Sequence, residues 1–123
     1  MSIFFAALVA VIHVYVFFLE SVAWGRPRTN RLFRVREDDA RTLAKFAFNQ
    51  GFYNLFLSLA IFAGLALRFG GHPIEGDTLI GYGAVSVLAA GLVLFASDPS
   101  LKRPALIQAL PAIGYLGFRI FGY

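Results

Sequence analysis

The stretch HVYVFFLESVAW, residues 13–24, decides the fold, because it places a histidine and a glutamate inside a long apolar run. The run extends from about Ser2 to Trp24, which is long enough for the ~20 residues that an α-helix needs to cross the hydrocarbon core of a bilayer. An ionisable side chain at that depth is costly, and it needs a partner or a purpose. The stretch therefore predicts a membrane-spanning helix with His13 and Glu20 as candidate functional residues.

The composition also indicates a membrane protein. Of the 123 residues, 59% are hydrophobic and 15% are charged, and the mean hydropathy is +0.70. Soluble domains contain roughly 45–50% apolar residues. The length fits one domain covering residues 1–123. The chain has no cysteine, which excludes disulfides, thiol catalysis and cysteine-ligated metals.

Four apolar segments predict the fold class. We expect helices at about residues 2–24, 39–68, 78–96 and 104–121. Segments of this length without alternating polarity must be helical, because hydrocarbon offers no partner for free backbone groups. The first segment has no basic residue before it, so we expect a retained span and not a signal peptide. The prediction is an all-α integral membrane protein, an up-down-up-down bundle of four transmembrane helices.

The basic residues predict the orientation of these helices. Nine of the 11 Lys and Arg residues fall in the first and third connections or beside them: Arg26, Arg28, Arg31, Arg34, Arg36, Arg41, Lys45, Lys102 and Arg103. Only Arg68 and Arg119 fall at the other end. By the positive-inside rule, both termini lie on the non-cytoplasmic side. The net charge of +4 is explained by this bias, with anionic lipid at the arginine-rich first connection as a second interpretation, and it does not indicate nucleic-acid binding.

Polar residues at one depth form the candidate binding site. Helix depth, counted at 1.5 Å per residue, places Glu20, Gln50, Asn54 and Gln108 in one layer of the basic half. His13 lies about two turns away, on the same face as Glu20. The full candidate layer consists of His13, Glu20, Asn49, Gln50, Tyr53, Asn54 and Gln108.

Three functions compete for this layer. It can hold helices together through side-chain hydrogen bonds, as in a non-enzymatic accessory or structural subunit. It can bind a small solute or a proton in a transporter or channel, since intramembrane ionisable groups are often functional. The third hypothesis is a lipid-modifying enzyme with His13 and Glu20 as acid and base. Structural glue is the favoured interpretation of the side chains themselves. The predicted function of the protein is nevertheless a small-solute or proton-coupled transporter or channel, with the accessory or structural subunit as the alternative and the enzyme as the least favoured.

No catalytic motif, metal site or cofactor site is predicted. His72, Glu75 and Asp77 carry metal-ligating groups, but a solvated connection is the preferred interpretation. Four helices enclose little volume, so we expect a homo-oligomer, most simply a dimer, within the lipid bilayer.

Segments of all four helices resemble a known family. They are HVYVFFLESVAW (13–24), NQGFYNLFLSLA (49–60), GYGAVS (81–86) and QALPAIGYL (108–116). They resemble a family of small bacterial inner-membrane proteins catalogued only as a domain of unknown function. The resemblance implies a multi-pass, four-helix protein of the bacterial cell membrane, and it implies no activity, substrate or cofactor.

Overall fold

The computed structural model describes residues 1–122, and within this range every regular element is helical. The elements are α1 (Ser2–Phe17), a π-helical turn η1 (Phe18–Val22), α2 (Pro27–Phe33), α3 (Glu37–Phe69), α4 (Pro73–Ser97), a 3₁₀ turn η2 (Pro99–Leu101) and α5 (Lys102–Ile120). The all-helical prediction is therefore confirmed.

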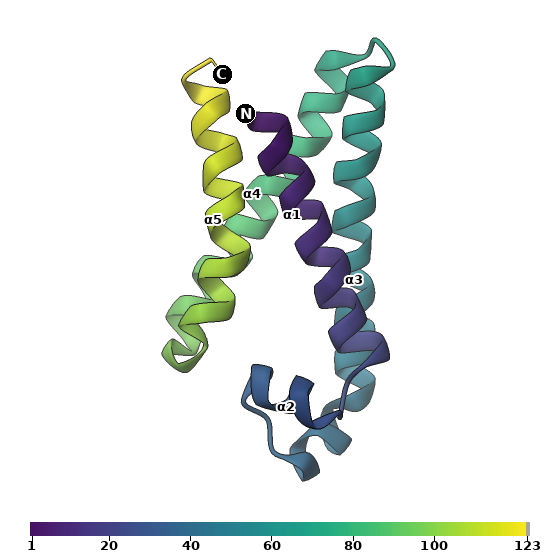
Figure 1. Cartoon of the computed structure of the whole chain (residues 1–123), viewed down its shortest axis with the longest axis vertical. Coiled ribbons are helices and arrows are strands. Elements are labelled where there is room, and N and C mark those ends of the chain that lie inside the picture. The colour runs from purple at the N-terminus through teal and green to yellow at the C-terminus, as the bar shows by residue number, and fades with distance from the viewer. Residues whose placement is uncertain (123) are drawn as a thin grey trace.

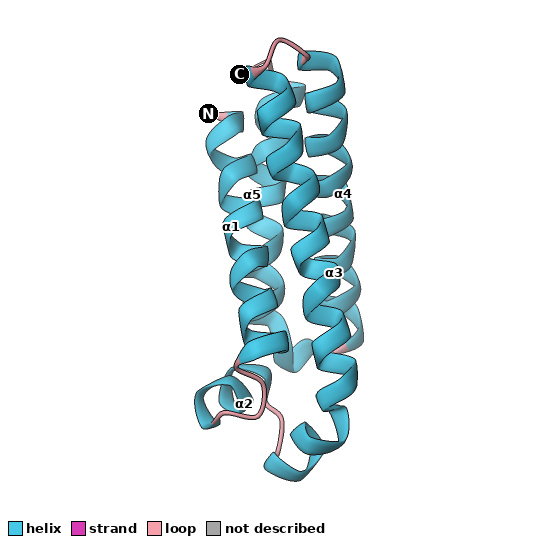
Figure 2. Cartoon of the chain, turned by 90° about the vertical axis from the view of Figure 1, so that its right-hand side faces the viewer, coloured by secondary structure: helices cyan, strands magenta, loops and turns pink. Residues whose placement is uncertain are grey.

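Four long helices lie side by side, as Figures 1 and 2 show. α1 packs against α3 and α5, and α4 packs against the same two helices. Both termini lie at the end of the molecule that carries the α3–α4 turn, and α2 lies at the opposite end (Figure 1). We call these the terminal end and the basic end.

Three helices are long and apolar enough to cross a membrane: Ser2–Val22, Glu37–Phe69 and Pro73–Ser97. α5 is not among these spans of the described chain, although its 19 residues suffice in length. Basic residues at both its ends and Gln108 within it lower its apolar content.

The structure differs from the predicted elements at the end of the first helix, at the start of the third predicted helix and in the first connection. The first helix ends at Val22 in a π turn, short of Trp24. The third predicted helix begins at Pro73 and not near residue 78, because proline is well suited to the first turn, where its missing N–H costs nothing. The first connection was predicted as a loop but contains α2, which also opens on a proline. Arg34, the residue after its last one, has the left-handed conformation, with φ of 55°.

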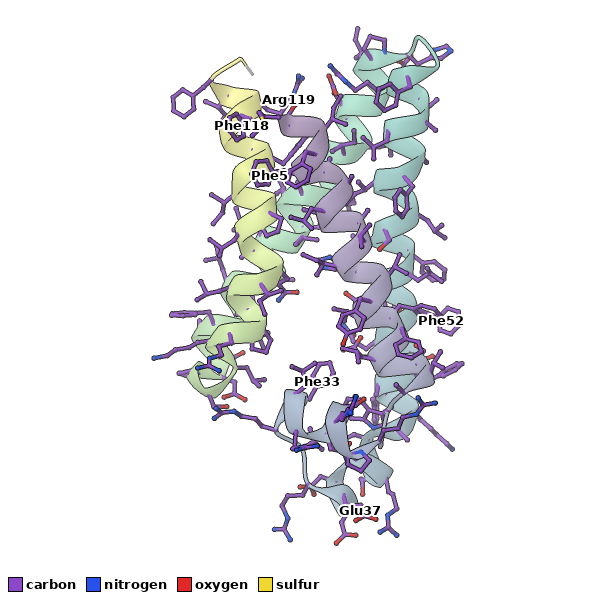
Figure 3. The ribbon with its side chains drawn as sticks, viewed as in Figure 1. Phe5, Phe33, Glu37, Phe52, Phe118 and Arg119 are labelled. Atoms are coloured by element: carbon purple, nitrogen blue, oxygen red, sulfur yellow. The ribbon has the colours of Figure 1, made fainter. Side chains whose placement is uncertain are left out.

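The first connection is fixed to α3 through Trp24. The indole Nε1 donates a hydrogen bond to the Ala40 carbonyl at 2.8 Å, and the ring lies 5.5 Å from that of Phe33 in α2. Figure 3 shows Phe33 on the side of α2 that faces the long helices. The connection is therefore anchored in place by contacts that involve its only tryptophan.

The apolar core lies toward the terminal end. Its buried members come from all four long helices: Ala6, Val9, Ala10, Ile61, Ile80, Ala84, Val87, Ala112 and Tyr115. A close approach of α3 and α4 completes this end, since a Cβ on Gly64 would lie 2.8 Å from the Gly76 carbonyl oxygen. Only residues without a side chain permit such contact between helix backbones.

An ion-pair cluster joins three helices at the terminal end. Arg68 of α3 pairs with Asp77 of α4, and Arg119 of α5 donates to Asp77 Oδ2 at 2.9 Å. The Asp77 side chain is 21% exposed. The two arginines that stand apart from the basic end thus share one carboxylate, and Figure 3 shows Arg119 at this position.

Replacement of Asp77 by Asn should lower the stability of the fold. The two arginines would lose their charged acceptor, at a cost of about 1.5–3 kcal/mol for charge-assisted hydrogen bonds. Thermal unfolding of the purified protein in detergent measures the effect. Glu75→Gln is the matched control, because Glu75 is exposed and its one ion-pair contact, to His72, is 4.0 Å long. Equal melting temperatures for the two variants would contradict a structural role for the cluster.

Candidate functional site

Polar side chains join α1 and η1 to α3 at three successive levels. Ser21 Oγ donates to the Phe48 carbonyl at 2.8 Å, Asn54 Nδ2 donates to Glu20 Oε2 at 2.7 Å, and Ser58 Oγ donates to the Ala10 carbonyl at 2.9 Å. We call this row the α1–α3 seam. Each bond crosses the same helix–helix interface, so the seam is a polar feature between two helices that are long and apolar enough to cross a membrane.

The π turn sets the direction of Glu20. Its hydrogen bond runs from the Ala23 N–H to the Phe18 carbonyl at 2.9 Å, one residue further than in an α-helix. A π turn advances less around the axis per residue, so residues after Phe17 are rotated relative to a continuous α-helix. The π turn therefore rotates Glu20 relative to the helix face that it was predicted to share with His13, and Glu20 points toward α3.

Gly51 permits the close approach of the two helices. Its backbone is buried against η1, and a Cβ there would overlap Ser21 Oγ and come within 3.1 Å of both Glu20 Cβ and the Phe17 carbonyl oxygen. Ser21 and Asn54 have short side chains, so their hydrogen bonds exist only because the backbones lie this close.

Among the described residues, the carboxylate of Glu20 has one hydrogen-bond partner, the side-chain amide of Asn54, and it faces the packed helix α3. The carboxylate is half-buried, and Asn54 Nδ2, which holds Oε2, also donates to the Gln50 carbonyl at 3.1 Å. The second bond fixes the amide of Asn54 on its own helix. The bond to Gln50 therefore orients the Asn54 amide toward Glu20, and the pair of side chains links α3 to the π turn.

The rest of the predicted layer is not assembled. The side chains of Asn49, Gln50 and Tyr53 are exposed, and Gln50 contributes its backbone carbonyl. Gln108 is half-buried on α5 beside Gly91 of α4. Among residues 1–122 no hydrogen bond joins the side chains of Gln50 or Gln108 to Glu20. Within the predicted layer, Glu20 therefore has a side-chain hydrogen bond to Asn54 alone among residues 1–122.

His13 is enclosed within the helix bundle. It is 2% exposed, and its Nδ1 donates to the Val9 carbonyl one turn earlier at 2.9 Å. This hydrogen bond to its own helix satisfies the ring nitrogen that carries the proton. The His13 ring is therefore packed between helices and hydrogen-bonded within α1.

Two residues of the seam were not singled out from the sequence as site residues. Ser21 and Ser58 are hydroxyl residues in apolar segments, and such residues hydrogen-bond across helices in membranes. Ser58 is fully buried, with a second bond to the Asn54 carbonyl at 3.1 Å. The available signals were the four-residue spacing of Ser58 from Asn54 and the position of Ser21 next to Glu20.

No group of three or more His, Cys, Asp or Glu side chains suited to hold a metal ion occurs in the described part of the chain. The residues considered for one, near the α3–α4 turn, have other contacts. Asp77 is held by two arginines, and His72 lies 4.0 Å from Glu75.

Replacement of Gly51 by Ala should separate the seam. The added methyl group would displace Ser21 from its bond to Phe48 and push η1 away from α3, and overpacking of this kind costs about 1–3 kcal/mol. Gly81→Ala is the matched control, because no atom lies within 4 Å of a Cβ at that position. Thermal unfolding in detergent compares the two variants. A Gly51 variant as stable as the Gly81 variant would contradict the close approach described above.

Comparison with known proteins gives one match. The profile of a family described as "Protein of unknown function (DUF1304)" matches residues 7–118. No curated protein and no solved structure matches the chain. The matched range includes every residue of the α1–α3 seam.

Proposed function

This chain belongs to the DUF1304 family of proteins of unknown function, and we propose that it is a non-enzymatic accessory or structural protein of the bacterial cell membrane. In this proposal the polar residues between its helices hold the fold together. The observation that carries it is the α1–α3 seam, in which each polar side chain has its partner on the neighbouring helix.

The proposal includes four membrane spans. α5 has 19 residues, and at 1.5 Å per residue it is about 28 Å long, close to the ~30 Å hydrocarbon core. It packs beside α1 and α4, both of which are long and apolar enough to cross a membrane. The basic end then faces the cytoplasm under the positive-inside rule, and both termini lie on the opposite side.

The energetic argument favours a structural role. Hydrogen bonds between membrane helices contribute about 0.6–2 kcal/mol each, so three of them stabilise the α1–α3 pair appreciably. Nearer the terminal end the interior is apolar, with Val9, Ile61 and Val87 fully buried. A polar route across the bundle would have to pass these side chains. The seam therefore suits attachment of one helix to another better than conduction.

Transport is the second candidate, and one observation favours it. Only Oε2 of Glu20 has a hydrogen-bond partner among residues 1–122, and the side chain is half-buried and not sealed. A carboxylate with one free oxygen can accept a proton or a polar solute. Transport would need the apolar core at the terminal end to open.

The lipid-modifying enzyme is not favoured. Its hypothesis requires one pocket that exposes both His13 and Glu20 to a lipid. His13 is 2% exposed and bonded within its own helix, whereas Glu20 faces α3. A general acid and base must both reach the reacting group, and the burial of His13 does not favour this.

Stability measurements test the structural role. Asn54→Leu should lower the free energy of unfolding by about 1–3 kcal/mol, because it leaves the half-buried carboxylate without its donor. Gln50→Leu, one turn earlier, should have little effect, because only the backbone of Gln50 is used. Reversible unfolding in mixed detergent micelles provides the comparison. Equal losses for the two leucine variants would remove the seam as the basis of the proposal.

Glu20→Gln separates structure from transport. An amide oxygen can still accept from Asn54, so the structural proposal expects nearly unchanged stability and no solute or proton flux in proteoliposomes for either protein. A proton-coupled transporter would show flux in the original protein and lose it in the Gln variant. Flux that depends on Glu20 would therefore overturn the structural proposal in favour of the second candidate.

A further inference from the structure

A hollow of about 600 Å³ lies at the basic end, between the end of the first helix and α2. One wall is apolar and aromatic and comes from α1 and η1, with Tyr15, Phe18 and Leu19. The other wall carries three arginines, Arg26, Arg28 and Arg31. The hollow is distinct from the α1–α3 seam, because Glu20 and Asn54 do not line it.

The three arginines have no carboxylate partner. The ion pairs found in residues 1–122 involve Arg41, Arg68, Arg119 and His72, and none of them involves an arginine of the hollow. The nearest acidic residues in sequence are Glu20, whose carboxylate is bonded to Asn54, and Glu37 and Asp38 in the first turn of α3, which pair with Arg41. Figure 3 shows Glu37 at the outer tip of the basic end. The positive charge over the hollow is therefore uncompensated.

The two walls match the two parts of a membrane lipid. Phe18 is 40% exposed and Tyr15 56%, so an apolar chain can lie against them without displacing a packed residue. Arginine presents a planar fork of N–H donors that suits phosphate oxygens. α2 holds two of the arginines on a short helix, and Trp24 and Phe33 fix the surrounding connection to α3.

We propose that this hollow binds one anionic phospholipid of the adjoining leaflet, with its phosphate against Arg26, Arg28 and Arg31 and its acyl chain against Tyr15 and Phe18. The cytoplasmic leaflet is rich in anionic lipids, and basic groups at its surface attract them. The site adds a ligand to the proposed structural role, and it does not depend on the hydrogen bonds of the seam.

Fluorescence quenching tests the proposal. Trp24 is the sole tryptophan, and it follows Ala23, which lines the hollow. The full chain is reconstituted in phosphatidylcholine vesicles that contain dibrominated phosphatidylglycerol or, at the same mole fraction, dibrominated phosphatidylcholine. Stronger quenching by the anionic lipid is the expected result. Equal quenching by the two brominated lipids in the original protein would overturn the proposal, with no variant required.

Paired variants separate the hollow from general surface charge. Each arginine that contacts the bound phosphate contributes about fivefold to the binding of that lipid, so Arg28→Gln with Arg31→Gln should weaken the preference roughly 25-fold. Arg34→Gln with Arg36→Gln removes the same charge from the same connection outside the hollow, and it should keep the preference. Equal losses in the two double variants would overturn the site. Helicity and melting temperature confirm that both variants fold.

Inorganic phosphate distinguishes a lipid from a soluble anion. Millimolar phosphate should leave the quenching by brominated phosphatidylglycerol unchanged, because the acyl chain contributes to binding. Displacement of the lipid by phosphate would contradict the proposal and assign the arginines to a soluble phosphate compound. Asn54→Leu should keep the lipid preference, so failure of this proposal and failure of the structural role are distinguishable.

Discussion

The close approach of the first helix to α3 at Gly51 is the constraint on which the polar contacts depend. In a bilayer the hydrophobic effect does not draw helices together, so packing and hydrogen bonding must do so. Short side chains such as Ser21 and Asn54 reach across only where the backbones nearly touch. The glycine thus determines which polar residues can pair, and the seam follows from it.

The molecule divides its stabilising interactions between its two ends. Toward the terminal end, apolar side chains from four helices fill the interior, and Asp77 holds two arginines outside it. At the basic end, the elements pack in pairs. Gly51 of α3 lies against η1, and Gly91 of α4 lies against Ala109 of α5. The charged residues of that end lie beyond the seam, on α2 and the start of α3. The arginines without a carboxylate partner therefore lie at the end of the fold away from the apolar core.

The sequence predicted depth well and direction poorly. The rise per residue is fixed, so counting residues placed Glu20 and Asn54 at one level, and the structure joins them. Gln50 and Gln108 share that level but not that direction, because rotation about a helix axis depends on packing and on the π turn. α2 and the early start of α4 depend on prolines at first helical positions, and apolar segments alone do not reveal such starts. The third helix was expected from about residue 78, which left Asp77 in a loop. In the structure α4 begins at Pro73, so Asp77 lies on a helix and pairs with Arg68.

The π turn has a consequence for how this chain tolerates change in length. Phe18–Val22 accommodates one residue more than an α-helix needs over the same rise. Removal of one residue there would return the segment to α geometry and leave the helix before it and the connection after it in place. Aligned relatives that lack the turn would show a single-residue gap at this point, and the rest of their sequence would stay in register.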